Sequence, residues 1–391
     1  MKQFVQLIKV EFSRIFSNNV LIAIFFGAPL LYGVLFGYVY KQAKVLDLPI
    51  VLIDQDMSPI SDKITDALHD NETLKIVEFK AGTENIAALM PSKGYAAVIT
   101  IPSNFEADLL QKRYPEVRID LNMSNILNAN FASKSIMKVL GTINAGIEIE
   151  TLKKQGMHPA QALKSYEPFK TNFNKLYNSS GNYTLFMMPG LMGAIMQQII
   201  FLGLALVFAR DFEDGYFNTL IQKSKWSSYH VLLKMTPFVL LTTIVWAAVA
   251  CFVPYFNIEV DVFTGPMLLL VVLLSLAAMA IGMLFSIAIP NQLKATELLM
   301  VISTPAFVLS GFTWPISAMP LFIQNIAQII PLTHFLEGFK KIAIYGGSYS
   351  DIKQELHSLF VIALIGFISI IVLLQMKINI QEQKNTIKTQ N

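Results

Sequence analysis

The stretch Phe307–Lys341 has the sequence FVLSGFTWPISAMPLFIQNIAQIIPLTHFLEGFKK, which is apolar enough for a lipid bilayer but is repeatedly interrupted by proline and glycine. Each proline removes a backbone donor, and a carbonyl left without a partner in lipid is costly. The stretch therefore predicts a span that ends near Trp314, a short amphipathic or re-entrant helix at about residues 317–330, and an emergence near Thr333. We expect Trp314 and His334 at the membrane interface, where amphipathic rings are favoured.

The composition favours a membrane protein with several spans. The chain has 391 residues, of which 54% are hydrophobic and 15% are charged. A formal net charge of +3 is too small to indicate nucleic-acid binding, and the basic residues gather near the ends of apolar runs. Cys251 is the single cysteine, so neither an intramolecular disulfide nor a cysteine-based metal site is available.

Six apolar runs are long enough to cross a bilayer, which takes about 20 helical residues. The predicted spans are residues 20–40, 185–208, 231–256, 267–289, 298–314 and 358–376. Basic residues beside the short loops fall on one side, which predicts that both termini are cytoplasmic. Residues 1–18 place apolar side chains at helical spacing opposite Lys2, Lys9, Glu11 and Arg14. This pattern predicts an amphipathic interfacial helix, with a plain charged leader as the alternative.

Residues 41–182 are more polar and predict a separate extracytoplasmic α/β domain. Strand-like runs at residues 48–54, 74–79, 95–101 and 117–122 alternate with helical stretches at 59–68, 84–90 and 104–111. A longer helix is expected at about residues 128–155. The predicted chain is an α-helical polytopic membrane protein in five parts. These are the interfacial helix 1–18, transmembrane helix 19–40, the outer domain 41–182, transmembrane helices 183–376 with a re-entrant segment 315–333, and the cytoplasmic tail 377–391.

Short polar motifs predict helix starts and turns inside the outer domain. Ser58 precedes Pro59, which suits the first position of a helix, and Ser103 with Glu106 has the spacing of a capping box. Asp54 and Asp56 follow the first strand. A paired acid–base site is conceivable there, but turn and cap duty is favoured.

The sequence offers no site for catalysis or metal binding that we could assign. No GxxxxGK[ST] motif occurs, so this chain is not expected to hydrolyse ATP by that route, and the five histidines have no HExxH spacing. Ionisable residues are nearly absent from the predicted spans, which counts against an ion-driven transporter. Uncharged polar side chains in the spans favour interhelical hydrogen bonds, with a substrate pathway as the alternative. The candidates for that pathway are Gln197, Gln198, Thr242, Ser303 and Ser310.

The segment after the second span, residues 209–220, has the sequence ARDFEDGYFNTL. It combines charges of both signs with aromatic side chains and a glycine. A short helix that docks into a groove of another protein would use such anchors, and plain interfacial packing explains them equally well. The residues concerned are Arg210, Asp211, Phe212, Glu213, Asp214, Gly215 and Phe217.

Together these features resemble the permease subunits of ABC-2 type transporters, in the bacterial branch with a large outer domain between the first two spans. The family has a pattern SGxxxPxxxMPxxxQxxxxxxPxxxxxxGxR near its fifth span, and Lys340 stands in place of its final arginine. The other positions are met by Ser310, Gly311, Pro315, Met319, Pro320, Gln324, Pro331 and Gly338. The segment 209–220 is similar to the family's RExGT-like coupling segment at Arg210, Asp211 and Gly215, but has Tyr216 and Phe217 where threonine is usual.

The resemblance implies a half-transporter in the bacterial inner membrane. Two six-span subunits, identical or paralogous, would pair, and cytoplasmic ABC ATPase subunits would engage the segment 209–220 and the amphipathic leader. ATP and magnesium would belong to the ATPase, so this chain would bind no cofactor. Phe212 and Phe217 would be anchors, while Arg210 and the neighbouring carboxylates would set the register. A membrane-fusion adaptor would be a further partner, docking on the outer domain.

The expected function is export of a small amphipathic molecule, drug or lipid by a subunit that is not itself an enzyme. The alternative is a membrane-anchored receptor or sensor whose outer domain binds a ligand without transport. An intramembrane enzyme would need a buried acid, base or metal cluster. In the transporter interpretation the helix 317–330 forms the outer gate of a dimeric pathway. The gate residues would be Gly311, Trp314, Pro315, Pro320, Gln324 and Pro331.

Overall fold

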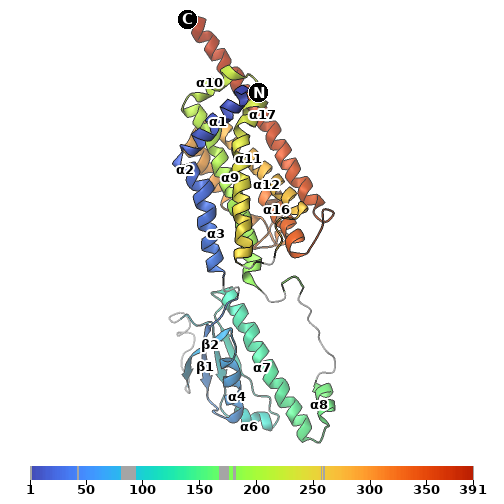
Figure 1. The fold of residues 1–391 in the computed structure, drawn as a ribbon. Coiled ribbons are helices and arrows are strands. Elements are labelled where there is room, and N and C mark those ends of the chain that lie inside the picture. The colour runs from blue at the N-terminus through green and yellow to red at the C-terminus, as the bar shows by residue number, and fades with distance from the viewer. Residues whose placement is uncertain are drawn as a thin grey trace. The chain divides into compact units, whose positions relative to one another are not determined.

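The computed structural model describes residues 2–41, 44–80, 94–166, 176–178, 182–256, 258 and 260–390, with side chains as far as residue 383. The chain divides into two compact units (Figure 1). The helical unit comprises residues 1–43 and 175–391, and the α/β unit comprises residues 44–174. The helix expected at residues 84–90 lies outside the described residues.

Six helices of the described residues are long and apolar enough to cross a membrane, which confirms the predicted number of spans. The first joins α2 (Asn19–Ile22), a π-helical turn (Ala23–Gly27) and α3 (Ala28–Val39). The next three are α9 (Tyr183–Glu213), α11 (Ser227–Tyr255) and α12 (Gly265–Ala288). The fifth joins α13 (Gln292–Ser303) to α14 (Ala306–Leu309), and the sixth is the first part of α17 (Lys353–Gln390).

Several span ends differ from the prediction. The fifth span ends at Leu309 rather than near Trp314, because Gly311 has a left-handed backbone with φ of +80° that no helix continues through. The second span continues to Glu213, five residues past its predicted end, since backbone hydrogen bonding continues after the apolar run stops.

Small residues let the central helix α12 approach its neighbours closely. Ala277, Ala278 and Ala280 are fully buried. A Cβ added at Gly282 would lie 2.7 Å from Leu204 Cβ in α9, and one at Gly366 in α17 would lie 2.7 Å from Ala280 Cβ. Helix packing in lipid depends on such contacts, because no hydrophobic effect drives helices together there.

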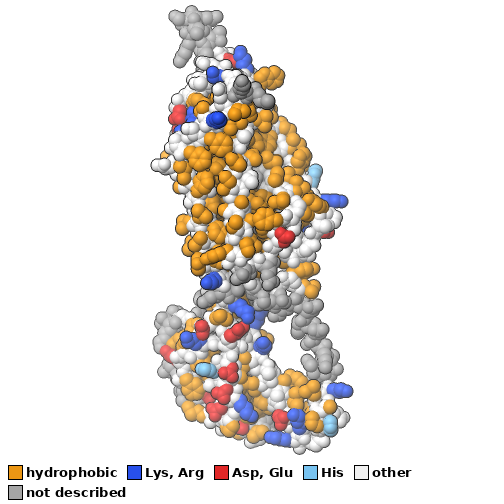
Figure 2. All heavy atoms as spheres, in the orientation of Figure 1, with side chains coloured by type: hydrophobic (Ala, Val, Ile, Leu, Met, Phe, Trp, Pro, Cys, Tyr) orange, Lys and Arg blue, Asp and Glu red, His pale blue; other side chains and the backbone are white. Residues whose placement is uncertain are grey.

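The surface of the helical unit suits a lipid environment. Figure 2 shows hydrophobic side chains over most of the visible face of the bundle, with lysine and arginine side chains gathered at the end that carries α1 and α10. Exposed apolar residues such as Leu30, Leu31 and Val301 lie on helices that meet the length and composition of spans. A folded soluble protein rarely leaves so much apolar surface open to water.

Two shorter helices lie at that end of the bundle (Figure 1). They are α1 (Lys2–Phe16), which packs against α11, and α10 (Tyr216–Lys223), which follows α9. The rings of Phe4 and Tyr229 meet at 5.3 Å between centroids. Glu11 is only 5% exposed, so its predicted place on the solvated face of α1 is wrong. It lies one turn from Leu7 and Ile15, in the middle of the apolar face.

The α/β unit is built on a four-stranded sheet in the order β2-β1-β3-β4. The strands are β1 (Leu48–Asp54), β2 (Leu74–Lys80), β3 (Ala97–Ile101) and β4 (Arg118–Leu121). β1 pairs in parallel with β2 and β3, whereas β3 and β4 are antiparallel. The described helices are α4 (Pro59–His69), α6 (Phe105–Leu110), α7 (Ile126–Lys154) and α8 (Pro159–Tyr166).

Alternation along the strands produces two buried faces. Leu48, Ile50 and Leu52 of β1 join a core that includes Leu68 of α4 and Ile136 of α7. The residues between them turn to the other face of the sheet, where Val51 and Ile53 meet Tyr95 and Val98. A strand buried on both faces is expected to be continuously apolar, as β1 is.

The predicted caps are correct at one helix and wrong at the other. Ser58 caps α4 and forms a reciprocal capping box with Ser61. Asn104, in a left-handed conformation, precedes α6 instead of Ser103 and makes no side-chain cap. Ser103 was expected to accept a hydrogen bond from the backbone amide of Glu106 in the first turn of α6. That amide instead donates to Asp56 Oδ2 at 2.9 Å. The preferred turn and cap roles of the aspartates are thus confirmed, since Asp54 Oδ1 also accepts from two turn amides.

Asp56→Asn is expected to loosen the start of α6. Burial raises the pKa of Asp56, but hydrogen bonds from Ser58 and from the backbone of Glu106 and its neighbours outweigh it and hold the pKa below its ordinary value. The stabilisation is therefore present above about pH 3.9 and is lost as the pH falls through the folded-state pKa. Hydrogen exchange of amides 104–110 in the full chain should quicken about fivefold at pH 7.

The matched control for this measurement is Asp66→Asn, which removes an exposed carboxylate from the middle of α4. Exchange at residues 104–110 should not change in that variant. After correction for intrinsic exchange rates, the difference between Asp56→Asn and the parent should shrink toward pH 3. A difference that stays constant over this range would contradict the role of the ionised carboxylate.

Candidate functional site

The segment 209–220 forms a helix, a turn and a second helix at one end of the bundle. Arg210 to Glu213 are the last turn of α9, and Gly215 has φ of +72° between α9 and α10. Left-handed backbone of this kind suits glycine, which has no Cβ to clash. The turn folds α10 back so that its first residue, Tyr216, faces the side chains of α1.

A cluster of four charged residues joins three helices beside this turn. We call Glu11 and Arg14 of α1, Asp211 of α9 and Lys234 of α11 the four-charge cluster. Lys234 Nζ donates to both Glu11 carboxylate oxygens at 2.8 Å and forms an ion pair with Asp211 Oδ2 at 2.6 Å. Arg14 Nη2 donates to Asp211 Oδ1 at 2.9 Å. Lys234 therefore bridges the two carboxylates, and Arg14 extends the alternating chain of charges from Asp211.

The cluster is almost completely removed from solvent. The side chains of Lys234 and Asp211 are 2% and 1% exposed, and that of Glu11 is 7% exposed. Burial of a charge is costly unless it is paired, so the three helices are held in the one arrangement that pairs all four groups. A relative movement of α1 against α9 or α11 would separate buried opposite charges.

Tyr216 at the start of α10 covers the cluster. The Arg14 guanidinium lies 4.0 Å from the centre of the Tyr216 ring, and Lys234 Nζ lies 5.5 Å from it. Burial, followed by the charge of Glu11, raises the pKa of Tyr216 above its ordinary value. The ring therefore stays neutral near pH 7 and offers its face to both cations.

A rim of charges continues outward from the cluster. Arg14 Nη2 also lies 3.3 Å from Asp214 Oδ2, and Arg210 Nε lies 3.4 Å from the same oxygen. Arg210 Nη1 donates to the Arg14 carbonyl at 2.8 Å. The predicted charged residues of segment 209–220 thus bind α1 of their own chain, while Glu213 accepts from the Gln292 amide of α13 at 3.0 Å.

The expectation that the spans hold almost no ionisable residue is wrong at this end of the bundle. Lys234 and Asp211 both lie inside helices that meet the criteria for spans. The sequence carried two signals that hydropathy averaging hides. Lys234 interrupts an apolar run, and Glu11 lies between Leu7 and Ile15 on the apolar face of α1. An isolated charge on each of two apolar surfaces indicates a buried pair.

The two predicted docking anchors have contacts within their own chain. The rings of Phe212 and Phe217 meet edge to face at 4.7 Å, and Phe217 is 5% exposed. Lys377 of α17 places Nζ 4.4 Å from the centre of the Phe212 ring. These contacts fix α10 to the bundle, so an anchoring role in a partner's groove stays a prediction. The surface of α10 that faces outward carries Thr219, Gln222 and Lys223 instead.

The predicted pathway residues are not brought together. The hydroxyl groups of Thr242, Ser303 and Ser310 donate to carbonyls one turn earlier in their own segments rather than to neighbouring helices. Gln197 is 1% exposed, and its Oε1 has no hydrogen-bond partner among the described residues. An uncharged polar side chain that does bond between helices is Ser286 of α12, whose Oγ accepts from the amides of Phe208 and Ala209 of α9 at 2.8 Å.

The predicted gate segment consists of short helices separated by proline. Ile316–Ala318 is a 3-10 turn, and Pro320 then precedes α15 (Leu321–Ile329), so the short helix expected at about residues 317–330 is present but begins only at Leu321. Pro331 is the first residue of α16 (Pro331–Phe339), where its missing N–H is not needed. Gln324 Nε2 donates to the Met319 carbonyl at 2.8 Å, which braces the turn between them.

The two aromatic residues expected at the interface differ in exposure. Trp314 is 58% exposed, as an interfacial tryptophan would be. His334 is only 8% exposed, with Nε2 2.8 Å from the Gln328 carbonyl, so its ring contacts the protein, and its place at the membrane interface stays a prediction. Gly190 of α9 packs closely against this segment, since an added Cβ there would clash with the Phe312 ring.

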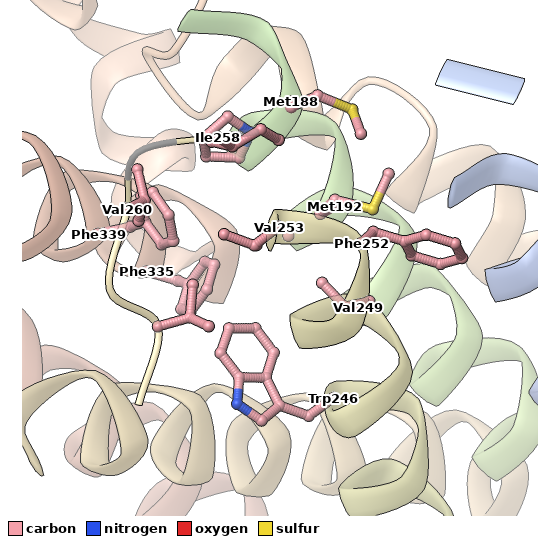
Figure 3. A pocket seen from close by; sticks show the side chains of 13 residues that line it. Met188, Met192, Trp246, Val249, Phe252, Val253, Ile258, Val260, Phe335 and Phe339 are labelled. Atoms are coloured by element: carbon pink, nitrogen blue, oxygen red, sulfur yellow. The ribbon is translucent and has the colours of Figure 1, made fainter. Parts of the chain in front are cut away.

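An apolar pocket of about 30 Å³ lies on one side of α16 (Figure 3). Phe335 and Phe339 of α16 face Trp246 and Val249 of α11 across it, and Met192 of α9 closes a third side. Its walls can hold apolar groups but offer no charge. The opposite side of α16 carries Thr333, His334 and Glu337 and, with Lys340 of the π-helical turn that follows (Lys340–Ile344), faces a second, polar cavity.

The sequence model of a protein family described as ABC-2 family transporter protein matches residues 20–373, which is most of the chain. The chain belongs to the ABC-2 transporter family. The resemblance expected from the gate segment and segment 209–220 is therefore confirmed.

Curated relatives agree with this membership. The chain is similar to the inner membrane transport permease YhhJ of Escherichia coli, with 22% identity over 83% of this chain and 85% of that protein. It is 21% identical to a protein named "Probable multidrug ABC transporter permease YbhR" of Escherichia coli, over 82% and 84% of the two chains. It is 23% identical to the linearmycin resistance permease protein LnrN of Bacillus subtilis, over 90% and 94%.

The site is therefore the end of an ABC transporter membrane permease at which α1, the α9–α10 turn and α11 are joined by buried ion pairs. ABC-2 permeases work with an ATPase partner. The buried ion pairs join the three helices, and the relatives are named as permeases.

Proposed function

We propose that this chain is the permease subunit of an ATP-driven exporter that moves a small amphipathic molecule outward across the inner membrane. A separate cytoplasmic ATPase would supply the energy by docking on α10 and α1. The observation that carries the proposal is the four-charge cluster, because it links α1, the α9–α10 turn and α11 at the end where the basic residues gather. The relatives named for multidrug transport and for linearmycin resistance support export as the direction.

The cluster explains how a push on α10 would reach the spans. A force applied to the exposed side of α10 acts on Tyr216 and on Arg14, which is paired with Asp211 of α9. Lys234 passes the same displacement to α11. Because separation of buried pairs is costly, α9 and α11 would move with α1 as one body. The docking surface would then be the rim of Glu213, Asp214 and the outward side chains of α10.

The same orientation gives the proposed places of the termini, α1, the α/β unit and the gate. The positive end of the bundle would be cytoplasmic, with both termini on that side and α1 lying in the interface as an amphipathic helix. The α/β unit would be extracytoplasmic and would serve as a docking surface for an adaptor protein. Two permease subunits, identical or paralogous, would form the pathway, with Gly311, Trp314, Pro315 and the α15 region as its outer gate.

Purification of the full chain from its native membranes tests the proposal. An ABC ATPase subunit should co-purify, and vesicles made with the complex should accumulate the amphipathic dye Hoechst 33342 only when ATP is supplied on the side of α10. Absence of both the ATPase and nucleotide-dependent accumulation would overturn the exporter and favour a receptor whose α/β unit binds a ligand.

Arg14→Gln is expected to lower ATP-driven dye accumulation about tenfold while the ATPase still binds. The variant removes a charge-assisted hydrogen bond to Asp211 and the cation beneath Tyr216, which together hold α1 on α9. The ratio of dye transported to ATP hydrolysed measures the loss. Lys9→Gln, an exposed lysine of the same helix, is the matched control and should keep that ratio. An unchanged ratio in both variants would show that the cluster does not transmit the movement.

A further inference from the structure

A polar cavity of about 550 Å³ lies between the gate segment, α16 and the start of α17. We call it the α16 cavity, and its chemistry is set by Phe312, Thr333, His334, Glu337, Lys340 and Glu355. It is large enough for a small organic molecule, in contrast to the apolar pocket on the other side of α16.

Two residues that line this cavity each carry a buried polar atom without a hydrogen-bond partner among the described residues. Glu355 is 4% exposed, and its Oε1 accepts from Lys341 Nζ at 2.6 Å, but its Oε2 has no hydrogen-bond partner among the described residues. Thr333 is 3% exposed, and its Oγ1 is likewise without a partner in the described part of the chain. A buried polar atom left unpaired is costly, and an ionised carboxylate only accepts, so Glu355 Oε2 calls for a hydrogen-bond donor, whereas the Thr333 hydroxyl can accept or donate.

His334 supplies a third acceptor. Its Nε2 lies 2.8 Å from the Gln328 carbonyl. Because a carbonyl oxygen only accepts, we assign the proton of the neutral ring to Nε2, which leaves Nδ1 as an acceptor. The walls of the cavity therefore carry acceptors at Glu355, Thr333 and His334 beside the ammonium donors of Lys340.

An aromatic surface beside these acceptors already holds an ammonium group. Lys340 Nζ lies 4.6 Å from the centre of the Phe312 ring, which stacks on Phe186 with 5.4 Å between ring centroids. Burial lowers the pKa of Lys340, although the charge of Glu337 opposes that effect. A partly desolvated aromatic face of this kind attracts organic cations. Four charges meet here, since Glu337 and Glu355 are balanced by Lys340 and Lys341.

We propose that the α16 cavity binds the protonated primary amine of an amphipathic cargo molecule, an inference that rests on the proposed export function. Glu355 and Thr333 accept its N–H donors, and the Phe312–Phe186 pair receives its apolar part. A charged donor is preferred over a hydroxyl group because a buried carboxylate oxygen forms its strongest hydrogen bonds with cations. The cargo class is therefore amine-bearing amphiphiles, held beside the gate before release.

Calorimetric binding to the full chain in lipid nanodiscs tests the proposal, with 2-phenylethylammonium and 2-phenylethanol as probes and empty nanodiscs as the blank. The amine should bind about tenfold more tightly than the alcohol. Phenyltrimethylammonium, which is charged but has no N–H donor, should bind more weakly than the primary amine. Equal affinity for the amine and the alcohol would overturn the proposal.

Two variants break the ion pair between Lys341 and Glu355. Their comparison separates the loss of the accepting carboxylate from the loss of folded protein. Glu355→Gln removes the carboxylate and should weaken amine binding about tenfold or more. Lys341→Gln breaks the pair with Glu355 but keeps the carboxylate, so it should bind the amine at least as tightly as the parent. Equal losses in both variants would contradict a direct role for Glu355.

Two further variants keep the test decisive if Glu355→Gln does not fold. Thr333→Val removes only the second acceptor and should weaken amine binding about threefold to tenfold. Lys340→Met removes the like charge from the Phe312 face and should strengthen it. No change in either variant would overturn the proposed site. The measurement uses neither ATP nor an ATPase, so a failure of amine binding leaves the export proposal standing, and a failure of export leaves the binding result standing.

Discussion

Lys234→Met is expected to destabilise the helical unit by about 3–5 kcal/mol, because it leaves the buried carboxylates of Glu11 and Asp211 with one cation fewer. Methionine has a similar length and is apolar, so the loss is one of charge rather than of volume. The melting temperature of the purified full chain, followed by size-exclusion chromatography after heating, should fall clearly below that of the parent.

Two variants test whether the loss comes from unpaired charge. The double variant Lys234→Met with Glu11→Gln should recover part of the stability, since Asp211 keeps its 2.9 Å contact with Arg14. Lys225→Met removes an exposed lysine that pairs with Glu382 at 3.0 Å, and its effect should stay within about 0.5 kcal/mol. A Lys234→Met protein that melts with the parent would show that the buried pairs contribute little.

The spans could be predicted from the sequence because the bilayer imposes a length and an apolar composition on each of them. Their ends could not be predicted as well. Hydropathy marks where apolar residues stop, but the backbone of α9 and α17 continues in helical hydrogen bonding beyond that point. The fifth span ends earlier than expected, since the left-handed backbone at Gly311 stops the helix while the apolar sequence continues.

The four-charge cluster could not be assembled from the sequence, although its members were visible there. Glu11 and Lys234 are 223 residues apart, and which helices become neighbours is decided by packing of the whole bundle. Glu11 and Arg14 were both placed on the polar face of α1, but the structure pairs them with Lys234 of α11 and Asp211 of α9. A carboxylate one turn from Leu7 and Ile15 needs a buried cation, and Lys234 is such a cation within an apolar run.

For the gate segment, the breaks in the backbone were predicted, whereas the side-chain contacts were not. Its prolines and glycine predicted where regular helix would fail, and the structure breaks at Gly311 and at Pro320. The side-chain chemistry was not predicted. Glu355 and Thr333 line one cavity only because α17 packs beside α16. Nothing in the local sequence distinguishes either residue from those at an ordinary helix start.

Gly311→Ala is expected to reduce ATP-driven dye transport by at least about tenfold while the complex with the ATPase still forms. An alanine would have to adopt φ of +80°, which costs about 1–2 kcal/mol for a residue with a Cβ. That Cβ would also lie 2.5 Å from Ile316 Cγ1 and 2.9 Å from Ile316 Cδ1, so the 3-10 turn must shift. Because about 1.4 kcal/mol changes an equilibrium tenfold, the gate would leave its native arrangement.

Gly346→Ala is the matched control for this experiment, since Gly346 has φ of +68° but nothing lies within 4 Å of its added Cβ. It isolates the backbone cost, and its effect on transport should be much smaller. The double variant Gly311→Ala with Ile316→Ala restores the space but not the backbone preference, so it should recover transport in part. Equal losses at Gly311 and Gly346 would show that backbone strain alone, and not the position of the turn over Ile316, controls the gate. Full transport by Gly311→Ala would remove the turn from the gate altogether.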